Sequence, residues 1–350
     1  MKDELDRQRH AQSSRRTLSE FEFIRTLRQQ VPVRDQTSLS LGIGDDAAVI
    51  RSHPGRDILI STDLLVEDVD FRRTSTTPTL LGHKSLAVSL SDIAAMGARP
   101  RWSLVSIGVP EDIWETNFVK DFYSGLLSLA SHYDVQLIGG DTSSTPEKIV
   151  IDSIILGECG TDLAVTRGGA KPGDQIFVTG YLGGAAAGLR LIERGAHLPS
   201  DPSEDLHLID HVMLRQLRPE PRVGWGIVLG QERLATAMID ISDGLSSDLN
   251  HLCVESKVGA LLDSSLIPID KQVADLCGRR ALDPLQLALH GGEDFELVFT
   301  VSPNNVSRLP RRVDGVSITH IGEIRDATEG IRISEGSRVW ELKPGGWRHF

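Results

Sequence analysis

The sequence predicts a mixed α+β protein that folds as two domains. With 350 residues, the chain is longer than one ordinary hydrophobic core accommodates. Short apolar runs typical of strands alternate with segments of helical periodicity, a pattern of α/β and α+β domains and not of a repeat protein. In addition, several apolar runs end in a polar turn that carries an acidic residue. These turns are the first candidates for a functional site.

The charge balance argues against a nucleic acid or an anionic membrane as the main partner. The 49 acidic residues outnumber the 37 basic residues, which gives a formal net charge of −12. Small anionic ligands are not excluded, because bound divalent cations turn a carboxylate-lined pocket into a phosphate site. The content of 40% hydrophobic and 25% charged residues is that of a globular protein.

The cysteines and the N-terminal segment indicate a reduced compartment. Cys159, Cys253 and Cys277 are odd in number and form no CxxC spacing, so neither a disulfide framework nor a zinc site is expected. The N-terminus lacks an apolar signal core, and no stretch approaches the ~20 apolar residues of a membrane span. We therefore expect a cytoplasmic protein.

The first half of the chain is predicted to form an N-terminal domain, residues 19–158, behind a polar and disordered extension, residues 1–18. A helix is expected from Ser19 to the residue before Pro32. A short strand from Val135 is expected to lead into a turn that holds Asp141. The other strands are expected at 42–50, 57–62, 102–110 and 149–158, and helices at 83–98 and 112–132.

The second half is predicted to form a C-terminal α/β domain, residues 159–350. Residues 158–173 combine Gly, Pro and charge without periodicity, as a domain boundary does. A glycine-rich turn and helix follow at 180–195, but their glycines do not match GxGxxG, and GxxxxGK[ST] is absent from the chain. Further strands are expected at 175–180, 236–242, 295–301, 318–324 and 330–334, with a helix after Ser242-Asp243.

The acidic turns have two interpretations that the residues alone leave open. They could form a shared site for hard cations, because Mg²⁺ prefers carboxylate oxygens and keeps positions free for phosphate. Alternatively, they are unrelated turns and helix caps, which Asp-Gly and Ser-Asp sequences form readily. The turns are GIGDDAA around Asp45 and Asp46, Ser61-Thr62-Asp63, the segment around Asp92, GGDT at 139–142, DISDG at 240–244 and GGED at 291–294.

Individual residues in these segments have equally open roles. Ser85, Ser89 and Asp92 fall at i, i+4 and i+7 of the expected helix, so their stripe either faces solvent or lines a site. Either Ser242 or Asp243 would serve as a helix N-cap. Arg167 is a candidate phosphate contact or an ordinary solvated side chain.

Taken in order, these motifs resemble the thiamine-monophosphate kinase family, within the superfamily that includes aminoimidazole ribonucleotide synthetase. The resemblance covers about residues 19–350 and rests on GIGDDAA, STD, SDIAAMGA, GGDT, TRGGAKPGD, DISDGLSSDL and GGEDFEL. It implies ATP-dependent phosphorylation of thiamine monophosphate to thiamine diphosphate with several Mg²⁺ ions. It also implies a two-domain, synthetase-like α+β fold and a homodimer whose N-terminal domains share a β-barrel.

The resemblance also assigns residues to roles. The magnesium-binding set that it implies is Asp46, Ser61, Thr62, Asp63, Asp92, Asp141, Asp240 and Asp243. The nucleotide-binding positions are Gly140, Asp141, Arg167 and Ser242. Glu293 and Trp347 match substrate-contacting positions, where a carboxylate would pair with the amino-bearing part of the vitamin and an indole would stack on it. Without that role, Trp347 would be an apolar plug that holds the C-terminus down.

One departure from the family pattern concerns the substrate. STDLLVEDVDF places Asp70 where the family commonly has a histidine, and we expect Asp70 to contact the cationic part of the substrate.

Two functions are alternatives to the kinase: another ATP-dependent synthetase of the superfamily, or a non-catalytic nucleotide- or metal-binding relative. For the kinase, direct in-line transfer without a general base is expected, because a phosphate monoester has its second pKa near ~6.

Overall fold

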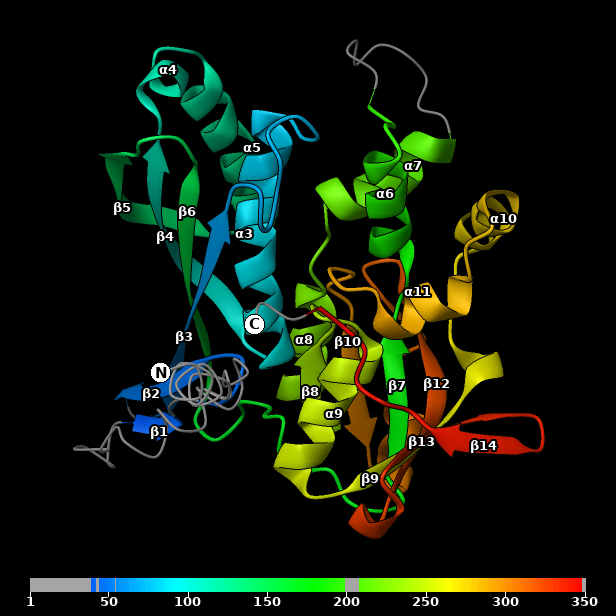
Figure 1. The fold of residues 1–350 in the computed structure, drawn as a ribbon. Coiled ribbons are helices and arrows are strands. Elements are labelled where there is room, and N and C mark those ends of the chain that lie inside the picture. The colour runs from blue at the N-terminus through cyan, green and yellow to red at the C-terminus, as the bar shows by residue number, and fades with distance from the viewer. Residues whose placement is uncertain (1–38, 42–43, 54, 199–207, 348–350) are drawn as a thin grey trace, which may run out of the picture.

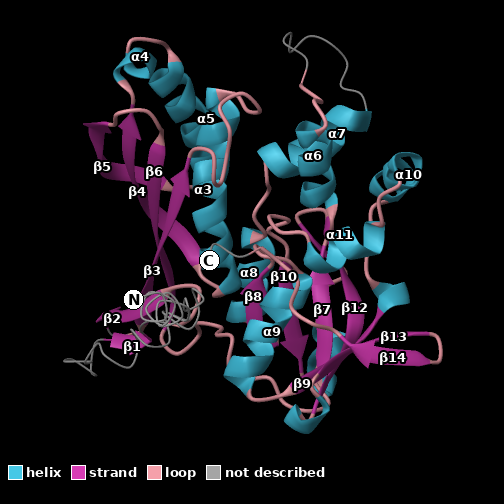
Figure 2. Cartoon of the chain, viewed as in Figure 1, coloured by secondary structure: helices cyan, strands magenta, loops and turns pink. Residues whose placement is uncertain are grey.

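The computed structural model describes residues 39–41, 44–53, 55–198 and 208–347. The predicted extension at 1–18 and the helix predicted from Ser19 lie outside the described residues. The chain forms two α+β domains, each built around one open sheet (Figures 1 and 2). Among the described helices, none is long and apolar enough to cross a membrane.

The first domain contains a six-stranded sheet in the order β1-β2-β3-β6-β4-β5. Only β4 and β5 run parallel; the other neighbours are antiparallel. Its strands are β1 (Leu39–Leu41), β2 (Ala48–His53), β3 (Arg56–Val66), β4 (Arg99–Val109), β5 (Gln136–Ser144) and β6 (Val150–Gly160). Its helices are α3 (Pro78–Ala95), α4 (Glu111–Trp114) and α5 (Phe118–His132).

Helices cover one face of this sheet and leave the other open. Helix α3 packs on β3 and β6, and α5 packs on α3 (Figure 1). Burial alternates along β3 and β6, so every second side chain lies under α3 while its neighbours lie on the open face. That open face carries half-buried or exposed Ile60, Leu64, Leu104, Ile154 and Leu156.

The second domain contains an eight-stranded sheet in the order β14-β13-β9-β12-β7-β10-β8, with β11 paired to β12. The strands are β7 (Gln175–Thr179), β8 (Ala235–Asp240), β9 (Gly259–Asp263), β10 (Leu297–Val301), β11 (Arg312–Val313), β12 (Val316–Arg325), β13 (Ile331–Glu335) and β14 (Arg338–Glu341). The helices are α6 (Gly184–Glu193), α7 (Leu208–Leu217), α8 (Val223–Gln231), α9 (Leu245–Ser256), α10 (Lys271–Arg280) and α11 (Pro284–His290), with short 3₁₀ turns Ser264–Leu266, Pro303–Arg308 and Ala327–Glu329.

Helix α3 joins the two domains. It lies between the first sheet and the second domain, where it contacts α8 and the end of β8 (Figure 1). The contact is close, since a Cβ on Gly226 of α8 would clash with the backbone of Ala94 in α3. The core around α3 therefore continues into the second domain, where it includes Trp225, Met238 and Phe299. A residue on α3 can reach both domains.

Several element boundaries differ from the prediction for local reasons. Helix α3 begins five residues early, at Pro78, because the Thr77 hydroxyl caps it by accepting from the Leu80 N–H at 3.2 Å. The helix predicted at 112–132 is divided by a break at 115–117. Asp141 lies within β5 and not in a turn after it.

Candidate functional site

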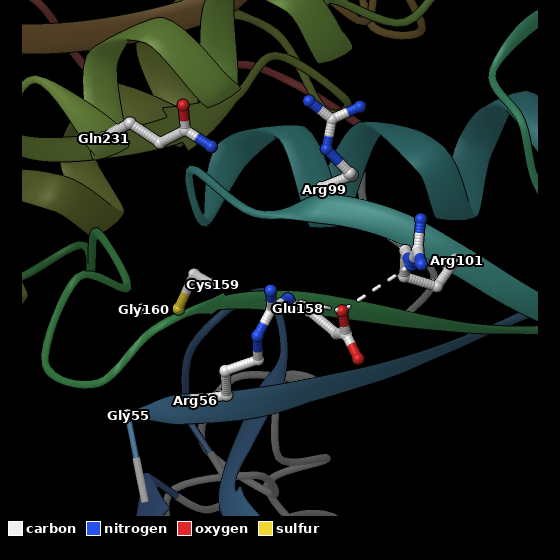
Figure 3. A pocket seen from close by; sticks show the side chains of 8 residues that line it. All are labelled: Gly55, Arg56, Arg99, Arg101, Glu158, Cys159, Gly160 and Gln231. Carbon is white, nitrogen blue, oxygen red and sulfur yellow. Dashed lines mark hydrogen bonds and ion pairs between the residues drawn. The ribbon is translucent and has the colours of Figure 1, made fainter.

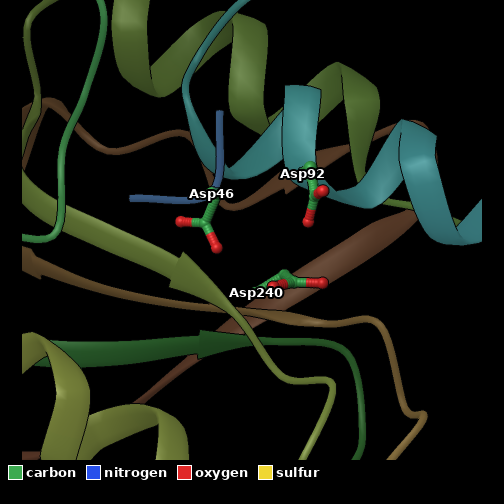
Figure 4. A group of neighbouring side chains, drawn as sticks. All are labelled: Asp46, Asp92 and Asp240. Atoms are coloured by element: carbon green, nitrogen blue, oxygen red, sulfur yellow. The ribbon is translucent and has the colours of Figure 1, made fainter. Parts of the chain in front are cut away.

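Three aspartates from distant parts of the chain converge at the domain junction. Asp46 lies in the loop before β2, Asp92 in the last turn of α3, and Asp240 at the end of β8 (Figure 4). Each offers a carboxylate oxygen, and these oxygens lie within 4.8 Å of one another. Asp240 belongs to the second domain and the others to the first, so the cluster exists only when the two domains are packed together.

Hydroxyl groups orient two members of this acidic cluster. Ser91 donates to Asp240 Oδ2 at 2.7 Å, and Ser61 donates to Asp92 Oδ2. Ser91 and Asp92 are adjacent on α3, so one turn of that helix both supplies a carboxylate and holds the carboxylate of the other domain. The predicted stripe faces inward, because Ser85 and Ser89 are fully buried and only Asp92 enters the cluster.

Asp63 is a fourth carboxylate beside the cluster. It projects from β3 on the face covered by α3, and its Oδ2 is buried with no hydrogen-bond partner among the described residues. Burial raises the pKa of Asp63 to about 6, and the charges of Asp152 and Asp46 add to the shift against the lowering effect of Ser89. A buried carboxylate oxygen without a donor is costly, so this atom suits a bound cation.

The raised pKa values of the neighbouring aspartates show that burial and mutual repulsion disfavour their charged forms. Burial raises the pKa of Asp240 to about 8, with the nearby charge of Asp46 as the second cause. Burial likewise raises the pKa of Asp45 to about 7, again reinforced by Asp46. The pKa of Asp92 lies well above its ordinary value, first through burial and then through Asp63 and Asp240. The carboxylates lack enough positive charge, and hard divalent cations would supply it.

Arg167 is the one basic side chain that the described structure brings onto these acids. Its Nη2 lies 2.6 Å from Asp46 Oδ1 and its Nε donates to Asp46 Oδ2 at 3.2 Å, a two-point contact. Its backbone N–H also donates to Asp45 Oδ2 at 3.1 Å. Burial alone would lower its pKa, but the charges of Asp46 and Asp45 hold that pKa above its ordinary value. The side chain is only 16% exposed, so it is not a solvated surface arginine.

The DISDG loop turns tightly at the start of α9. Gly244 precedes the helix, and neither Ser242 nor Asp243 caps it, so that expectation is wrong. Instead Asp248, one turn inside α9, accepts from the N–H groups of Asp243 (3.2 Å) and Gly244 (3.0 Å). Burial raises the pKa of Asp248 well above its ordinary value. A side chain inside the helix thus holds the backbone of the preceding loop, which carries Asp243.

The C-terminal tail docks on the same loop. Gly345 and Gly346 donate backbone N–H groups to the hydroxyls of Ser246 and Ser247, each at 3.2 Å. Trp347 N–H donates to the Asp243 carbonyl at 3.1 Å, while its side chain stays 55% exposed. Trp347 is therefore not a buried apolar plug. Its exposed indole is held beside the loop that carries Ser242 and Asp243.

Glu293 lies in the GGED loop at the entrance to β10. Its φ is +64°, and its N–H donates to the Ser242 carbonyl at 2.7 Å. Lys84 Nζ of α3 lies 2.6 Å from Glu293 Oε1, and Gln216 of α7 donates to Oε2. Lys84 is only 4% exposed. Lys84 of the first domain thus holds a carboxylate of the second domain.

Comparison with known proteins identifies the family. The family model described as "AIR synthase related protein, N-terminal domain" matches residues 44–159. The family model described as "AIR synthase related protein, C-terminal domain" matches residues 171–334. The thiamine-monophosphate kinase of Buchnera aphidicola subsp. Schizaphis graminum is 38% identical over 336 residues, covering 95% of this chain and 99% of that relative. The chain belongs to the thiamine-monophosphate kinase family.

Two further relatives match nearly the whole chain. The thiamine-monophosphate kinase of Bacillus subtilis is 36% identical over 338 residues, covering 95% of this chain and 100% of that protein. A solved structure described as "AaThiL complexed with AMPPCP and TMP" superposes with a TM-score of 0.83 at 32% identity, covering 97% of this chain and all of that one. The family resemblance carried by the ordered motifs is confirmed.

Not all residues that the family resemblance assigned come together in this chain. Thr62 is exposed on the open face of the first sheet, where its hydroxyl donates to Asp152 at 2.6 Å. Asp141 is exposed on the same face. It lies on β5, three strands away from β3, which carries Thr62. Asp70 Oδ2 accepts from the Val66 N–H at 2.7 Å and so stabilises its own turn. Their assigned roles remain predictions.

Two residues of this family member were missed at the sequence level. Lys84 is a charged residue in a helix of small and apolar side chains, and that isolation was the available signal. Asp248 stands in SSDL, where an acid in the first turn of a helix has an ordinary electrostatic explanation. Only the packed structure shows that Lys84 reaches Glu293 and that Asp248 shapes the loop of Asp243.

Proposed function

We propose that this chain transfers the γ-phosphoryl group of ATP to the phosphate of thiamine monophosphate, which yields thiamine diphosphate. The observation that carries the proposal is the acidic cluster of Asp46, Asp92 and Asp240, formed by both domains at their junction. A family relative complexed with AMPPCP, an ATP analogue, and with TMP shares the fold over its full length. A junction of two domains is also where small-molecule sites commonly form.

The acidic cluster fits Mg²⁺, and we propose Asp46, Asp63, Asp92 and Asp240 as its principal ligands. Their donors are carboxylate oxygens, which hard cations prefer, and the unpartnered Asp63 Oδ2 offers a ligand atom. Ser61 and Asp243 remain proposed as further contacts, and Thr62 and Asp141 as contacts that need a further rearrangement or a second chain. When bound, the ions supply the positive charge that lets two anionic substrates approach.

Arg167 is proposed to bind nucleotide phosphate together with Ser242, Gly140 and Asp141. Its guanidinium neutralises Asp46 in the structure described here, and a phosphate can replace one of these contacts. Bound cations on the acids would release the arginine for that role. The residues that surround the cluster are therefore proposed to hold and orient phosphate groups, and the proposal needs none of them as a general base.

The transfer is proposed to be direct and in line. The phosphate acceptor is largely dianionic at neutral pH, since the second pKa of a phosphate monoester is near ~6, so no general base is needed. Positioning by the protein then dominates catalysis. A chiral γ-phosphate label distinguishes the routes: direct transfer inverts its configuration, and retention would indicate a phosphorylated enzyme intermediate.

The vitamin end of the substrate is proposed to contact Glu293, Trp347 and Asp70. Glu293 keeps part of its carboxylate accessible, with 30% of its side chain exposed, and the exposed Trp347 indole offers a face for stacking. Asp70 is proposed to pair with the cationic part of the substrate, although it also caps its own turn. Glu293 and Trp347 both contact the loop of Ser242 and Asp243, which follows Asp240 in the chain.

We further propose a homodimer in which two first domains pair through their open sheet faces and close a β-barrel. The support is the uncovered face with Leu64, which is 61% exposed, and the edge strand β5, whose residues are almost all exposed. An unpaired edge and an apolar face both favour pairing with another chain.

The boundary between the two domains is proposed at residues 158–159.

The activity is tested by measuring ADP release and thiamine diphosphate formation with purified chain, ATP and Mg²⁺. We expect both products with thiamine monophosphate, and neither with thiamine or with a precursor of aminoimidazole ribonucleotide. Asp240→Asn should lose most turnover and remain folded. ADP release that is equal with and without thiamine monophosphate, or that depends on the aminoimidazole precursor, would reject the proposal.

A further inference from the structure

A separate cavity lies at the other end of the first sheet. It has a volume of about 400 Å³ and forms where β3 and β4 begin and β6 ends, with Gln231 at the end of α8 across from them (Figure 3). Arg56 lies seven residues before Asp63 on β3, which places about 23 Å of strand between these two residues at ~3.3 Å per residue. None of the residues that line the cavity belongs to the acidic cluster of Asp46, Asp92 and Asp240. The two sites are distinct.

Basic side chains dominate the walls of this cavity. Arg56, Arg99 and Arg101 line it together with a single acidic residue, Glu158. Arg56 Nη1 lies 2.9 Å and Arg101 Nε 3.5 Å from the same oxygen, Glu158 Oε2. Two arginines therefore share one carboxylate, and positive charge remains in excess although the whole chain carries a net charge of −12.

Arg99 is the basic group that this carboxylate leaves unmatched. Its backbone lies opposite Glu158 in the β4–β6 ladder, yet within the described part of the chain it forms no ion pair. Figure 3 shows its guanidinium turned away from Glu158, on the side of the cavity where the Gln231 amide lies. This guanidinium and this amide both offer N–H donors to one ligand.

We propose that this cavity binds a small phosphate-bearing anion through Arg99, with Arg56, Arg101 and the Gln231 amide as further donors. The planar guanidinium matches the spacing of phosphate oxygens and contacts two of them at once. The volume lies within the range of small-molecule sites. Inorganic diphosphate and a nucleoside diphosphate share this chemistry. The proposal stands independently of the kinase reaction.

Calorimetric titration of the full chain without divalent metal and with a chelator present tests this proposal. Under these conditions the acidic cluster repels anions, so the arginine cavity is the site expected to respond. We expect one inorganic diphosphate per chain, and binding that weakens as salt is added. A parallel titration with ADP identifies the source of the ligand: tighter binding than diphosphate indicates a nucleotide, and weaker or equal binding an inorganic anion.

Substitutions locate the binding. Arg99→Ala should weaken diphosphate binding by about ten- to hundredfold, the effect of losing charge-assisted hydrogen bonds, with an unchanged melting temperature because Arg99 is exposed. Arg99→Lys should recover part of the affinity. Arg338→Ala removes an exposed arginine on β14 and should leave binding unchanged. Absence of binding to the unsubstituted chain, or equal binding by the Arg99→Ala variant, would overturn the proposal.

Discussion

Lys84 and Glu293 form an ion pair of 2.6 Å between the two domains. The lysine side chain is 5% exposed and the carboxylate 30% exposed, so the pair is largely withdrawn from water. Removing one member of such a pair leaves an uncompensated charge, which costs more than the pair itself contributes. Lys84 stands on the helix that also supplies Asp92, so the same element orients both ends of the proposed substrate site.

We predict that Lys84→Met raises the KM for thiamine monophosphate at least tenfold, with a smaller change in kcat. Without the ammonium, Glu293 is free to turn away from the substrate, and the folded state loses about 1–3 kcal/mol, the cost of a partly buried group that has lost its partner. Lys84→Arg keeps the charge and should restore much of the KM. Steady-state kinetics with varied thiamine monophosphate at saturating ATP measure the effect. An unchanged KM in a folded Lys84→Met variant would contradict the role of Glu293 in binding.

The acidic cluster predicts a stability that falls as pH rises when divalent ions are absent. An unfolded aspartate loses its proton near pH ~4, whereas folded Asp240 holds it to about pH 8 and Asp63 to about pH 6. In this window the folded state binds more protons, so the free energy of unfolding decreases by up to about 1.4 kcal/mol per pH unit for each such group. The contribution of Asp63 should therefore end above about pH 6, and that of Asp240 above about pH 8.

Thermal unfolding between pH 5 and pH 9, with a chelator and then with excess Mg²⁺, measures this prediction. Added Mg²⁺ should raise the melting temperature most at high pH, because cations bind the deprotonated carboxylates. Asp240→Asn removes one titrating group and should flatten the decline. Two results would show that folding does not raise the pKa of these acids. One is a stability that is independent of pH without metal, and the other is an Asp240→Asn variant whose stability falls with pH as steeply as that of the unsubstituted chain.

Much of the fold and part of the site were predictable because they depend on local pattern. The run IVIDSIILGE alternates buried and half-buried side chains in β6, which is the period of a strand. The family resemblance assigned Asp46, Asp92 and Asp240 to one magnesium-binding set, and the structure brings their carboxylates together.

The remainder was unpredictable because it depends on packing between distant segments. No local pattern tells that Lys84 on α3 faces Glu293, which lies more than 200 residues later in the sequence. Asp141 appeared to lie in a Gly-Asp turn, but GGDT pairs with β4 and continues as strand. The tight geometry of Gly140 explains this: a Cβ there would clash with the Val105 carbonyl, so the glycine allows the two strands to approach.

If two first domains pair through their open sheet faces, one charge introduced on that face should separate the proposed dimer. Leu64→Asp should convert a species of twice 38.3 kDa into a monomer, because it buries an unpaired carboxylate in an apolar interface. Leu64 is 61% exposed in the single chain, so the fold should be retained. Leu127→Asp, at a 48% exposed position of α5 on the covered side, is the matched control. Sedimentation velocity measures both, and a monomeric unsubstituted chain would reject the dimer.

The docked tail predicts that Gly346 is needed for substrate binding although it carries no side chain. A Cβ at Gly346 would clash with the Asp243 carbonyl and lie 2.6 Å from Ser247 Oγ, so Gly346→Ala should lift the tail and displace Trp347. We expect a KM for thiamine monophosphate raised about tenfold, comparable with Trp347→Ala, since both remove the indole from the site.

The melting temperature should change little in Gly346→Ala, because the tail contributes few buried contacts. Gly278→Ala is the matched control: it lies within α10, nothing approaches its Cβ within 4 Å, and alanine favours a helix. Its kinetics should equal those of the unsubstituted chain. If Gly346→Ala kept a normal KM while Trp347→Ala lost it, the indole would act without the tail geometry described here. If both kept a normal KM, Trp347 would have no part in substrate binding.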